Sequence, residues 1–389
     1  MASKLNILII GASGGVARAF LKRIGRDRQS IGRLLLADRH EGVLRDAFIP
    51  HKALNYEFIK TNVDATNDPE TYRTLLREYS IHLVIDLSVN ETRPMLEATD
   101  ALGISYMNTG IANRPGESFA EVVLDVLRKK DDGWHAPHML CAGMNPGIVN
   151  AWVRQGIERF GVPRGIIHFE YDTGQPLKEW LPLITWSRET FLDEIVNDPA
   201  GFMEGKDRLK SLYPNPLKHR VEMREILSAV VPLEQYPSGF LLLHEENIII
   251  AQRYDIPSRF LFAIDPRTMD YLETMYDKNG SVPLEAIWLG DNREIALKGS
   301  ATVGVRLEYK DRQVYFLNRT QHEQIPGSSG SCWQVAAGLQ VALQTLLQES
   351  LSDGIYFMED LYGTLWEKRV AENLPKEELI LEGSSMIPA

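Results

Sequence analysis

Short apolar runs, each followed by glycine or polar residues, recur along the first third of the chain. Asn6–Ile10 is almost wholly apolar, which is typical of a strand buried on both faces of a parallel sheet. An amphipathic stretch, Val16–Ile24, follows it and predicts a helix. Similar apolar runs lie at residues 34–37, 83–88, 105–110 and 138–143. The alternation predicts an α/β domain with a parallel sheet over residues 1–145.

The pattern changes after Pro146-Gly147, where an α+β substrate and dimerisation domain is expected over residues 146–326. Ile148–Phe160 has the spacing of an amphipathic helix, and Ile166–Tyr171 alternates like a strand. The remaining expected elements are strands at 240–244 and 247–251, helical stretches within 182–218, and a hairpin of 301–310 with 312–317. Most of this sheet is expected to be antiparallel.

The last part of the chain begins with Gly327–Ser331, whose composition predicts a flexible joint. Trp333–Glu349 is an amphipathic helix rich in small residues, and we expect it to return to the first domain. The polar tail, 373–389, is expected to be loosely held. Residues 327–389 are therefore predicted to pack back on the first domain.

A glycine turn joins the first strand to the first helix, with the spacing G-x-x-G-x-x-A over Gly11–Ala17. Gly11 permits the tight turn, Gly14 lets the backbone approach a pyrophosphate, and Ala17 lets helix and strand pack closely. This order of elements predicts a Rossmann-type domain. The side of the turn that meets the cofactor comprises Gly11, Ser13, Gly14, Gly15 and Val16. A tight turn without a ligand is the alternative.

The second apolar run ends in Asp38, and this position decides the expected cofactor. A carboxylate there accepts hydrogen bonds from both ribose hydroxyls of NAD and repels a 2′-phosphate, so we expect NAD. Arg39 and His40 are also able to stack on adenine or to meet a 2′-phosphate, so NADP stays open. Further along, Ser88 and Thr109 follow strands, and we expect them beside the nicotinamide together with Asn145.

Composition narrows the classes of partner. The 389 residues suffice for two domains, and a net charge of −11 with a pI near 5.4 argues against nucleic acid or an anionic membrane. No apolar run is long enough to span a bilayer. Cys141 and Cys332 lack metal-ligand spacing, so no metal is expected, and so few thiols suggest a reducing cytoplasm. Met1–Lys4 leads directly into the first strand, so no signal peptide is expected.

One segment resembles a known family. Cys141–Val149 is similar to the G-x-NPG-x-V segment of the saccharopine dehydrogenase-like superfamily, and within it the chain most resembles bacterial homospermidine synthase. The similarity recurs, in the order of the family, at Glu170–Thr173, Thr185–Ser187 with Phe191 and Glu194, His244–Asn247, and Trp333–Gly338.

This resemblance implies a reaction in which NAD acts as a prosthetic hydride carrier. A diamine such as putrescine is oxidised to an imine and loses ammonia, a second amine condenses with the product, and the same NADH reduces the new Schiff base. The resemblance thus implies an oxidoreductase and aminoalkyl transferase of polyamine biosynthesis, with a small amine as substrate. A cytoplasmic homodimer is expected.

The resemblance also implies roles for five residues. Glu170, Trp186 and Glu194 match the positions that hold ammonium groups, His244 matches a site histidine, and Asn145 matches a polar residue by the nicotinamide. Taken alone, each has an ordinary interpretation. Trp186 is typical of a core aromatic, the two glutamates of solvated acids, His244 of a structural histidine, and Asn145 of a turn.

The chain departs from the family in one place that bears on the substrate. Ala112 stands where the family carries a glutamate, and Arg114 nearby would suit a carboxylate. The alternative function is therefore a saccharopine or carboxynorspermidine dehydrogenase-like reductase, which consumes NAD(P)H to reduce an amine–carbonyl Schiff base. A dinucleotide-binding protein without catalysis is a third interpretation, against which the polar set around Trp186 argues.

Overall fold

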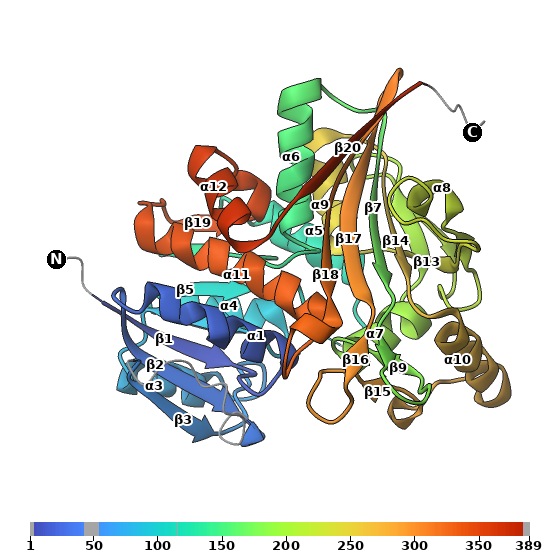
Figure 1. The fold of residues 1–389 in the computed structure, drawn as a ribbon. Helices are drawn as coiled ribbons and strands as arrows, with labels where there is room; N and C mark the ends of the chain where they lie inside the picture. The colour runs from blue at the N-terminus through green and yellow to red at the C-terminus, as the bar shows by residue number, and fades with distance from the viewer. Residues whose placement is uncertain (1–3, 43–53, 115, 384–389) are drawn as a thin grey trace. The chain divides into compact units, whose positions relative to one another are not determined.

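The computed structural model describes residues 4–42, 54–114 and 116–383 (Figure 1). They fall into two compact units. The first contains the described residues up to Ile148 together with Cys332–Asn373, and the second contains Val149–Ser331 together with the described residues from Leu374 onward. Each unit has its own sheet and its own core.

The sheet of the first unit has seven parallel strands in the order β19-β6-β5-β4-β1-β2-β3. The order reverses at β1, which is the arrangement of a Rossmann-type sheet, and the prediction is confirmed. The strands are β1 (Leu5–Ile10), β2 (Ile31–Asp38), β3 (Tyr56–Lys60), β4 (Leu83–Asp86), β5 (Ser105–Asn108), β6 (Pro137–Met139) and β19 (Gly354–Tyr356).

Helices connect these strands, and local sequence fixes where they begin. Asp68, for example, accepts a hydrogen bond from the Thr71 amide and precedes Pro69, so one acid and one proline start a helix. The helical elements are α1 (Gly15–Ile24), η1 (Gly25–Asp27), α3 (Pro69–Glu78), α4 (Thr92–Asp100), α5 (Phe119–Arg128), α11 (Gly330–Gln348), η5 (Met358–Asp360) and α12 (Thr364–Asn373). Most of α11, from Cys332 onward, belongs to the first unit.

The second unit is built on a mixed sheet of nine strands, which is partly visible edge-on in Figure 1. Its main path runs β11-β10-β14-β7-β17-β18-β20, and β13 joins β14 and β12. The strands are β7 (Gly165–Asp172), β10 (Ala200–Met203), β11 (Leu209–Tyr213), β12 (Val221–Glu222), β13 (Ser238–Leu242), β14 (Ser258–Ala263), β17 (Ser300–Glu308), β18 (Arg312–Gln321) and β20 (Glu377–Glu382). The hairpin expected around Asp311 is confirmed as β17 and β18.

Short elements complete the second unit. Two small ladders pair β8 (Gln175–Pro176) with β16 (Leu297–Lys298), and β9 (Leu183–Ile184) with β15 (Trp288–Leu289). The helical elements are α6 (Ile148–Phe160), α7 (Arg188–Leu192), η2 (Asp193–Asn197), α8 (Arg224–Leu227), α9 (Glu245–Tyr254), α10 (Pro266–Asn279), η3 (Leu284–Ala286) and η4 (His322–Gln324).

The alternation along β7 separates two cores, one on each face of the sheet. Ile167, Phe169 and Tyr171 join one cluster. His168 and Glu170 face the other way, where the register places them beside Phe260 and Phe262 of β14, which belong to the second cluster. The predicted alternation is therefore right, but the interpretation of Glu170 as a solvated acid is wrong, because its exposed fraction is 6%. A carboxylate on this apolar face requires a partner.

The segment 247–251 was expected to be a strand, and this expectation is wrong. It lies inside α9, where Ile248, Ile249 and Ile250 are buried. The Asn247 side chain accepts from the His244 amide and donates to the Leu242 carbonyl, which starts the helix. These bonds and the burial of the isoleucines outweigh the preference of β-branched residues for strands. The expected helices within 182–218 are reduced to α7 and η2, and most of that segment is loop and strand.

Two expectations about the end of the chain are also wrong. Ser328 and Ser329 in the expected flexible joint are fully buried, and Ser329 Oγ donates to the Thr185 carbonyl at 2.7 Å. The tail expected to lie loosely on the first domain instead forms β20, which pairs with β18 in the second unit. Leu379 and Leu381 of β20 pack on a core cluster, and this contact holds the strand. Residues 384–389 lie outside the described residues.

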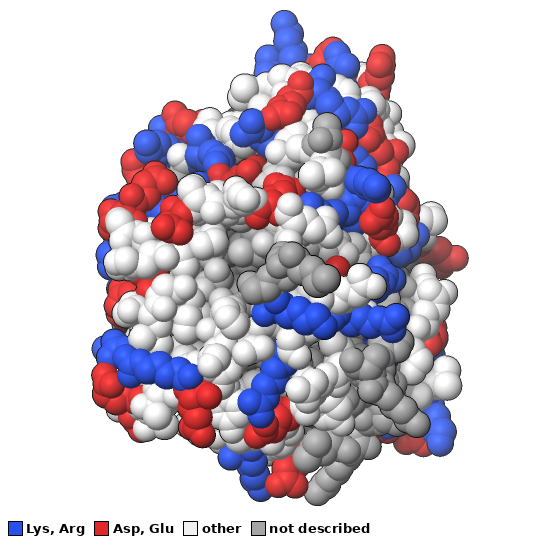
Figure 2. Space-filling view, turned by 90° about the vertical axis from the view of Figure 1, so that its left-hand side faces the viewer, with Lys and Arg blue, Asp and Glu red and all other residues white. Residues whose placement is uncertain are grey.

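Among the described residues, no helix is both long enough and apolar enough to cross a membrane. On the face drawn in Figure 2, basic and acidic side chains are interspersed, in keeping with the mixed composition of 42 Lys and Arg and 53 Asp and Glu. This face therefore carries charged side chains of both signs.

Candidate functional site

The glycine turn of the first unit is sterically closed on one side. Gly11 has φ +73°, and a Cβ there would lie 2.5 Å from the Leu87 carbonyl oxygen, so this position requires glycine. A Cβ on Gly15 would lie 2.8 Å from Cys332 Sγ. The turn is closed by a hydrogen bond from the Gly14 amide to the Gly11 carbonyl at 3.0 Å. The backbone of the turn is thus held in one shape at the start of α1, where a helix N-terminus favours phosphate.

Asp38 is bound to this turn through its carboxylate. It accepts hydrogen bonds from the Ser13 amide at 2.9 Å and from the His40 amide at 2.8 Å. Ser13 Oγ in turn donates to the His40 carbonyl at 2.7 Å. The acid that ends β2 and the glycine turn that follows β1 are therefore one connected structure, as a ribose and a pyrophosphate of one dinucleotide require.

Ser88, Thr109 and Asn145 follow β4, β5 and β6, at the carboxyl edge of the same parallel sheet. Ser88 Oγ donates to Asp86 at 2.6 Å, and burial raises the pKa of this aspartate. The turn that carries Asn145 is covered by α11, because a Cβ on Gly338 would lie only 2.0 Å from the Gly143 carbonyl oxygen. Local fold alone thus gathers these predicted cofactor residues at one edge of the first unit.

The second unit holds the other predicted residues on the face of its sheet that carries Glu170. Trp186 packs edge-on against Phe191, with ring centroids 6.0 Å apart, and in a tilted arrangement against Phe262, with ring centroids 6.2 Å apart. Phe262 is the register neighbour of Glu170. Trp186 is only partly buried, although its Nε1 is buried and has no hydrogen-bond partner among the described residues. Trp186 therefore forms an aromatic wall beside Phe262, the register neighbour of the buried Glu170. Because it is only partly buried, it is not purely a core residue.

Glu194 lies on a π-helical turn, η2, that continues α7. Such turns are rare and often occur at functional sites. The Ser187 side chain accepts from the Thr190 amide and starts α7, which fixes the direction in which the turn presents Glu194. Burial raises the pKa of Glu194 to about 7, although its neighbour His244 acts in the opposite direction.

His244 stands at the centre of a group of three carboxylates. Its Nε2 lies 3.5 Å from Glu194 Oε1, and its Nδ1 lies 3.0 Å from Glu245 Oε2 and in contact with Glu246 Oε2. Burial acts to lower the pKa of His244, but attraction to Glu246 and Glu245 raises it well above 6.5. The imidazole ring is also 5.0 Å from the ring of Phe260. Apolar packing on one side and acids on the other leave a protonated imidazole as the stable form.

Sequence reasoning did not find all of this site. Glu245 and Glu246 were noted only as part of a matching segment, yet both are buried against His244. Asp198 was not noted at all, and burial raises its pKa to about 6. The run of two acids directly after a histidine at a helix start was the available signal.

A second buried network of hydrogen bonds, also not expected from the sequence, includes Thr185, the residue before Trp186. Asp172 at the end of β7 accepts from His322 Nε2 at 3.0 Å, from Ser331 Oγ at 2.8 Å and from Thr185 Oγ1. These interactions, the one with His322 foremost, hold the pKa of Asp172 below its usual range despite full burial. The network joins β7, the residue before Trp186 and the serine-rich segment.

The departures at Ala112 and Arg114 have a local structural setting in the first unit. The Ala112 amide donates to Thr92 Oγ1 at 2.9 Å, and the Thr92 amide donates to the Ala112 carbonyl at 3.0 Å. The Arg114 guanidinium is more than half exposed and makes two hydrogen bonds to Glu91, at 3.2 and 3.1 Å. A substrate carboxylate would have to compete with Glu91, so this role stays a prediction.

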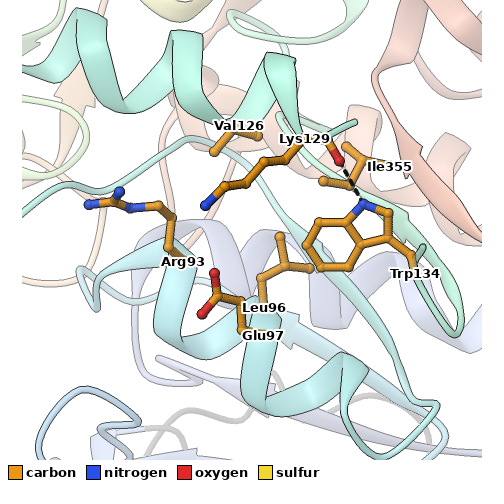
Figure 3. Close-up of a pocket in the computed structure, with 7 residues that line it drawn as sticks. All are labelled: Arg93, Leu96, Glu97, Val126, Lys129, Trp134 and Ile355. Atoms are coloured by element: carbon orange, nitrogen blue, oxygen red, sulfur yellow. Dashed lines mark hydrogen bonds between the residues drawn. The ribbon is translucent and has the colours of Figure 1, made fainter. Parts of the chain in front are cut away.

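A small pocket lies elsewhere in the first unit, among α4, α5 and β19, with the Trp134 ring as one wall (Figure 3). Its lining residues are Arg93, Leu96, Glu97, Val126, Lys129, Trp134 and Ile355. Arg93 is paired with Glu117, and Lys129 with Asp125. None of the predicted site residues lines this pocket, and its cations already have partners, so we assign it no function.

Comparison with known proteins bears directly on the first unit. Residues 7–134 match the family described as the saccharopine dehydrogenase NADP binding domain. These residues of the first unit are therefore similar to a dinucleotide-binding domain of the saccharopine dehydrogenase type. This confirms the resemblance and a nicotinamide cofactor. No curated protein sequence matches the chain.

Among solved structures, homospermidine synthase from Legionella pneumophila in complex with NAD superposes with a TM-score of 0.75. The match covers 97% of this chain and 91% of that chain at 14% identity, which shows a common fold. An engineered D-amino acid dehydrogenase bound to NADP+ matches at a TM-score of 0.39 and 9% identity, covering 92% of this chain and 94% of that chain. That superposition is too loose to carry an argument. The chain thus has the fold seen in that homospermidine synthase, and residues 7–134 within it are similar to the saccharopine dehydrogenase NADP binding domain.

Proposed function

We propose that this chain is an NAD-dependent enzyme of the homospermidine synthase type, which joins two amines through oxidation and Schiff-base reduction. The fold and the dinucleotide-binding domain support a nicotinamide-dependent oxidoreductase. The amine substrate rests on the second unit. There, Glu170, Glu245 and Glu246 lie buried and Glu194 has a side chain 12% exposed, around one apolar, aromatic face with His244 among them. This accumulation of buried acid is the observation that carries the proposal.

The acids would hold ammonium groups, because a desolvated carboxylate binds a cation far more strongly than an exposed one does. Trp186 would add a cation–π contact of about 0.5–2 kcal/mol. His244 would exchange a proton at Nε2 with the amine that reacts, since the carboxylate at Nδ1 fixes the ring. The aromatic wall of Trp186, Phe191 and Phe262 would exclude water.

NAD is the proposed cofactor, held by the turn Gly11–Val16 and by Asp38, with Ser88, Thr109 and Asn145 at the nicotinamide end. When bound, it supplies the hydride acceptor for the amine carbon and the hydride donor for the Schiff base. Asp38 supports NAD over NADP, because its carboxylate stands where a 2′-phosphate would meet a negative charge.

The reductase of an amine–carbonyl Schiff base is the second candidate. It is favoured by Ala112, which removes one acid expected of the synthase, and by the NADP-binding description of the matching family. The two candidates differ in what happens to the cofactor. A synthase recycles its nicotinamide, whereas a reductase consumes one NAD(P)H for each product.

The deciding experiment is mass spectrometry of the products formed from putrescine and a limiting amount of NAD. The synthase yields a coupled triamine and ammonia in many-fold excess over NAD. A product that forms only with stoichiometric loss of NAD(P)H, from an amine and a keto acid or semialdehyde, would replace the synthase with the reductase.

Two variants test whether the acidic face binds the amine. Glu170→Gln keeps shape and removes charge, and it should lower kcat/KM for the diamine by roughly ten- to a hundredfold, as expected for one charge-assisted hydrogen bond. Trp186→Phe should retain part of the activity and Trp186→Ala less. Glu285→Gln, an exposed acid of the same unit, is the matched control. Equal losses in Glu170→Gln and Glu285→Gln would count against the amine site.

A further inference from the structure

The start of α9 brings three potential metal ligands together. One ligand atom each of His244, Glu245 and Glu246 lies within 4.8 Å of the other two, and all three residues are buried. His244 Nδ1 and Glu245 Oε2 are 3.0 Å apart. Donors bound to one zinc-sized ion at about 2.0–2.1 Å are separated by roughly 3.3 Å in a tetrahedron. Small side-chain movements would therefore bring these atoms onto one ion.

His168, on the face of the sheet that carries Phe260, is an independent observation. It is fully buried on β7, and neither of its ring nitrogens has a hydrogen-bond partner among the described residues. Its register neighbour on β14 is Phe260, whose ring lies 5.0 Å from the ring of His244. The charged groups that act on the His168 imidazole are Glu246 and His244.

Among the described residues, Glu246 also has a buried polar atom without a hydrogen-bond partner. One of its carboxylate oxygens contacts His244, while Oε1 is buried and has no hydrogen-bond partner among the described residues. A buried imidazole and a buried carboxylate oxygen, both unpartnered, are costly in a dry interior. A bound cation would satisfy both at once.

We propose that His244, Glu245 and Glu246 form a binding site for a divalent transition-metal ion of the zinc type, which His168 joins as the fourth ligand by moving toward the other three. Two imidazoles with two carboxylates suit Zn²⁺ or Co²⁺, whereas Mg²⁺ and Ca²⁺ prefer oxygen ligands alone. The ligands come from β7 and from the start of α9, so the folded second unit assembles the site. The sequence predicts no metal, because its two cysteines lack metal-ligand spacing, and the two histidines of this site are far apart along the chain.

The metal would compete with the amine. This consequence, unlike the site itself, rests on the proposed function, in which His244 and its neighbouring acids serve the substrate. A metal that binds here would displace the imidazolium proton of His244 to solvent, take the lone pair so freed and neutralise the carboxylates. Zinc should therefore inhibit amine turnover, and a saturating diamine should weaken zinc binding.

The test is equilibrium dialysis of the full metal-free chain against Zn²⁺, with the visible absorption spectrum of added Co²⁺ as a second readout. One equivalent of Zn²⁺ should bind, and Co²⁺ should show the bands of a four-coordinate site. Glu245→Gln and His168→Gln should each weaken binding at least about tenfold, since even loss of an outer-shell partner has such effects. His135→Gln, which removes a side chain 70% exposed, controls for surface binding and should bind as the unmodified protein does.

Circular dichroism shows which variants remain folded, and either ligand variant suffices. The proposal is overturned if the unmodified chain retains no Zn²⁺ beyond a nonspecific background, or if folded Glu245→Gln and His168→Gln proteins bind as His135→Gln does. Diamine turnover in the absence of metal is measured separately. Turnover without zinc binding rejects only the metal site, and zinc binding without turnover of any amine rejects only the proposed function.

Discussion

Individual side chains of the second unit take their character from burial more than from their type. Glu194 and Asp198 would be ordinary acids in water, yet burial raises the pKa of the first to about 7 and of the second to about 6. The acids around His244 raise its pKa. Burial instead lowers the pKa of His168 to about 4. The same residue type thus serves as a cation in one place and as a neutral ring in the other.

The raised pKa of Glu194 has a consequence for stability. The folded protein holds this proton up to about pH 7, whereas the unfolded chain releases it near 4.5. The folded state therefore binds more protons in that range, and the free energy of unfolding falls as pH rises. Below about pH 6.5 His244 is charged in both states and adds no slope.

Glu194→Gln should remove this part of the pH dependence. Urea unfolding from pH 4.5 to 6.5 should show the unmodified protein losing on the order of 2 kcal/mol more than the variant. Asp198 is present in both proteins, so its contribution cancels. Equal slopes would mean that Glu194 is solvated and ionised in the folded protein.

At the scale of one carboxylate, we propose that Asp38 sets a preference for NAD over NADP. Asp38→Ser should weaken NAD binding and narrow the preference for NAD over NADP by roughly tenfold, as expected for a lost charge-assisted hydrogen bond. Fluorescence titration with both cofactors measures this. Asp38→Asn removes the charge at nearly constant shape, but its single oxygen accepts from only one of the Ser13 and His40 amides, so any loss of NAD affinity there combines the lost charge with one lost acceptor. Tighter binding of NADP than NAD by the unmodified protein would make Arg39 the better determinant.

At the scale of elements, helix ends and close helix contacts place the sites. The π-helical turn after α7 presents Glu194, and the start of α9 presents His244 with its two acids. In the first unit, α11 approaches so closely to the turn around Asn145 that only glycine fits at position 338. The positions of functional side chains therefore depend on contacts made elsewhere along the same element.

Gly338→Ala tests the contact between α11 and that turn. The added Cβ would meet Gly143 backbone atoms at 2.0 and 2.5 Å, and backbone cannot move aside as a flexible side chain would. Thermal unfolding should show a loss of roughly 1–3 kcal/mol, the usual range for overpacking, together with weaker NAD binding. Gly133→Ala is the matched control, since a Cβ there meets nothing within 4 Å. Unchanged stability and NAD affinity would show that α11 can shift freely.

For the whole molecule, segments far apart in the sequence complete each unit. The first unit takes α11, β19 and α12 from the end of the chain, and the second takes β20. Strand β20 lies along β18 and turns Leu379 and Leu381 toward a core cluster, while Ile380 between them is 39% exposed. The last described strand is thus a structural part of the second unit.

Charge substitutions along β20 should reveal which face is buried. Leu379→Asp or Leu381→Asp should lower the stability of the second unit by on the order of 2–3 kcal/mol, because an apolar side chain is lost and a charge is placed against the core. Ile380→Asp on the opposite face should change it by less than about 0.5 kcal/mol. Calorimetry measures the transitions. Equal effects at the three positions would show that β20 is not held against β18 in solution.

The sequence by itself determined the parts of this protein that follow from short-range patterns. Apolar runs buried on both faces, the glycine turn and Asp38 predicted the parallel sheet and the dinucleotide site, because each depends on neighbouring residues within one strand–turn–helix unit. The strict alternation along β7 likewise predicted which of its side chains share a face. The hairpin around Asp311 and the return of α11 followed from similar signals.

Only the tertiary structure decided the rest. Three isoleucines after His244 favour a strand locally, but capping bonds and burial made them a helix, and this change placed Glu245 and Glu246 against the histidine. Whether Glu170 meets water or an apolar face depended on strands paired across large sequence separations. Burial, and with it the protonation and partners of each acid and histidine, is a property of the packed molecule, so no pattern along the chain could supply it.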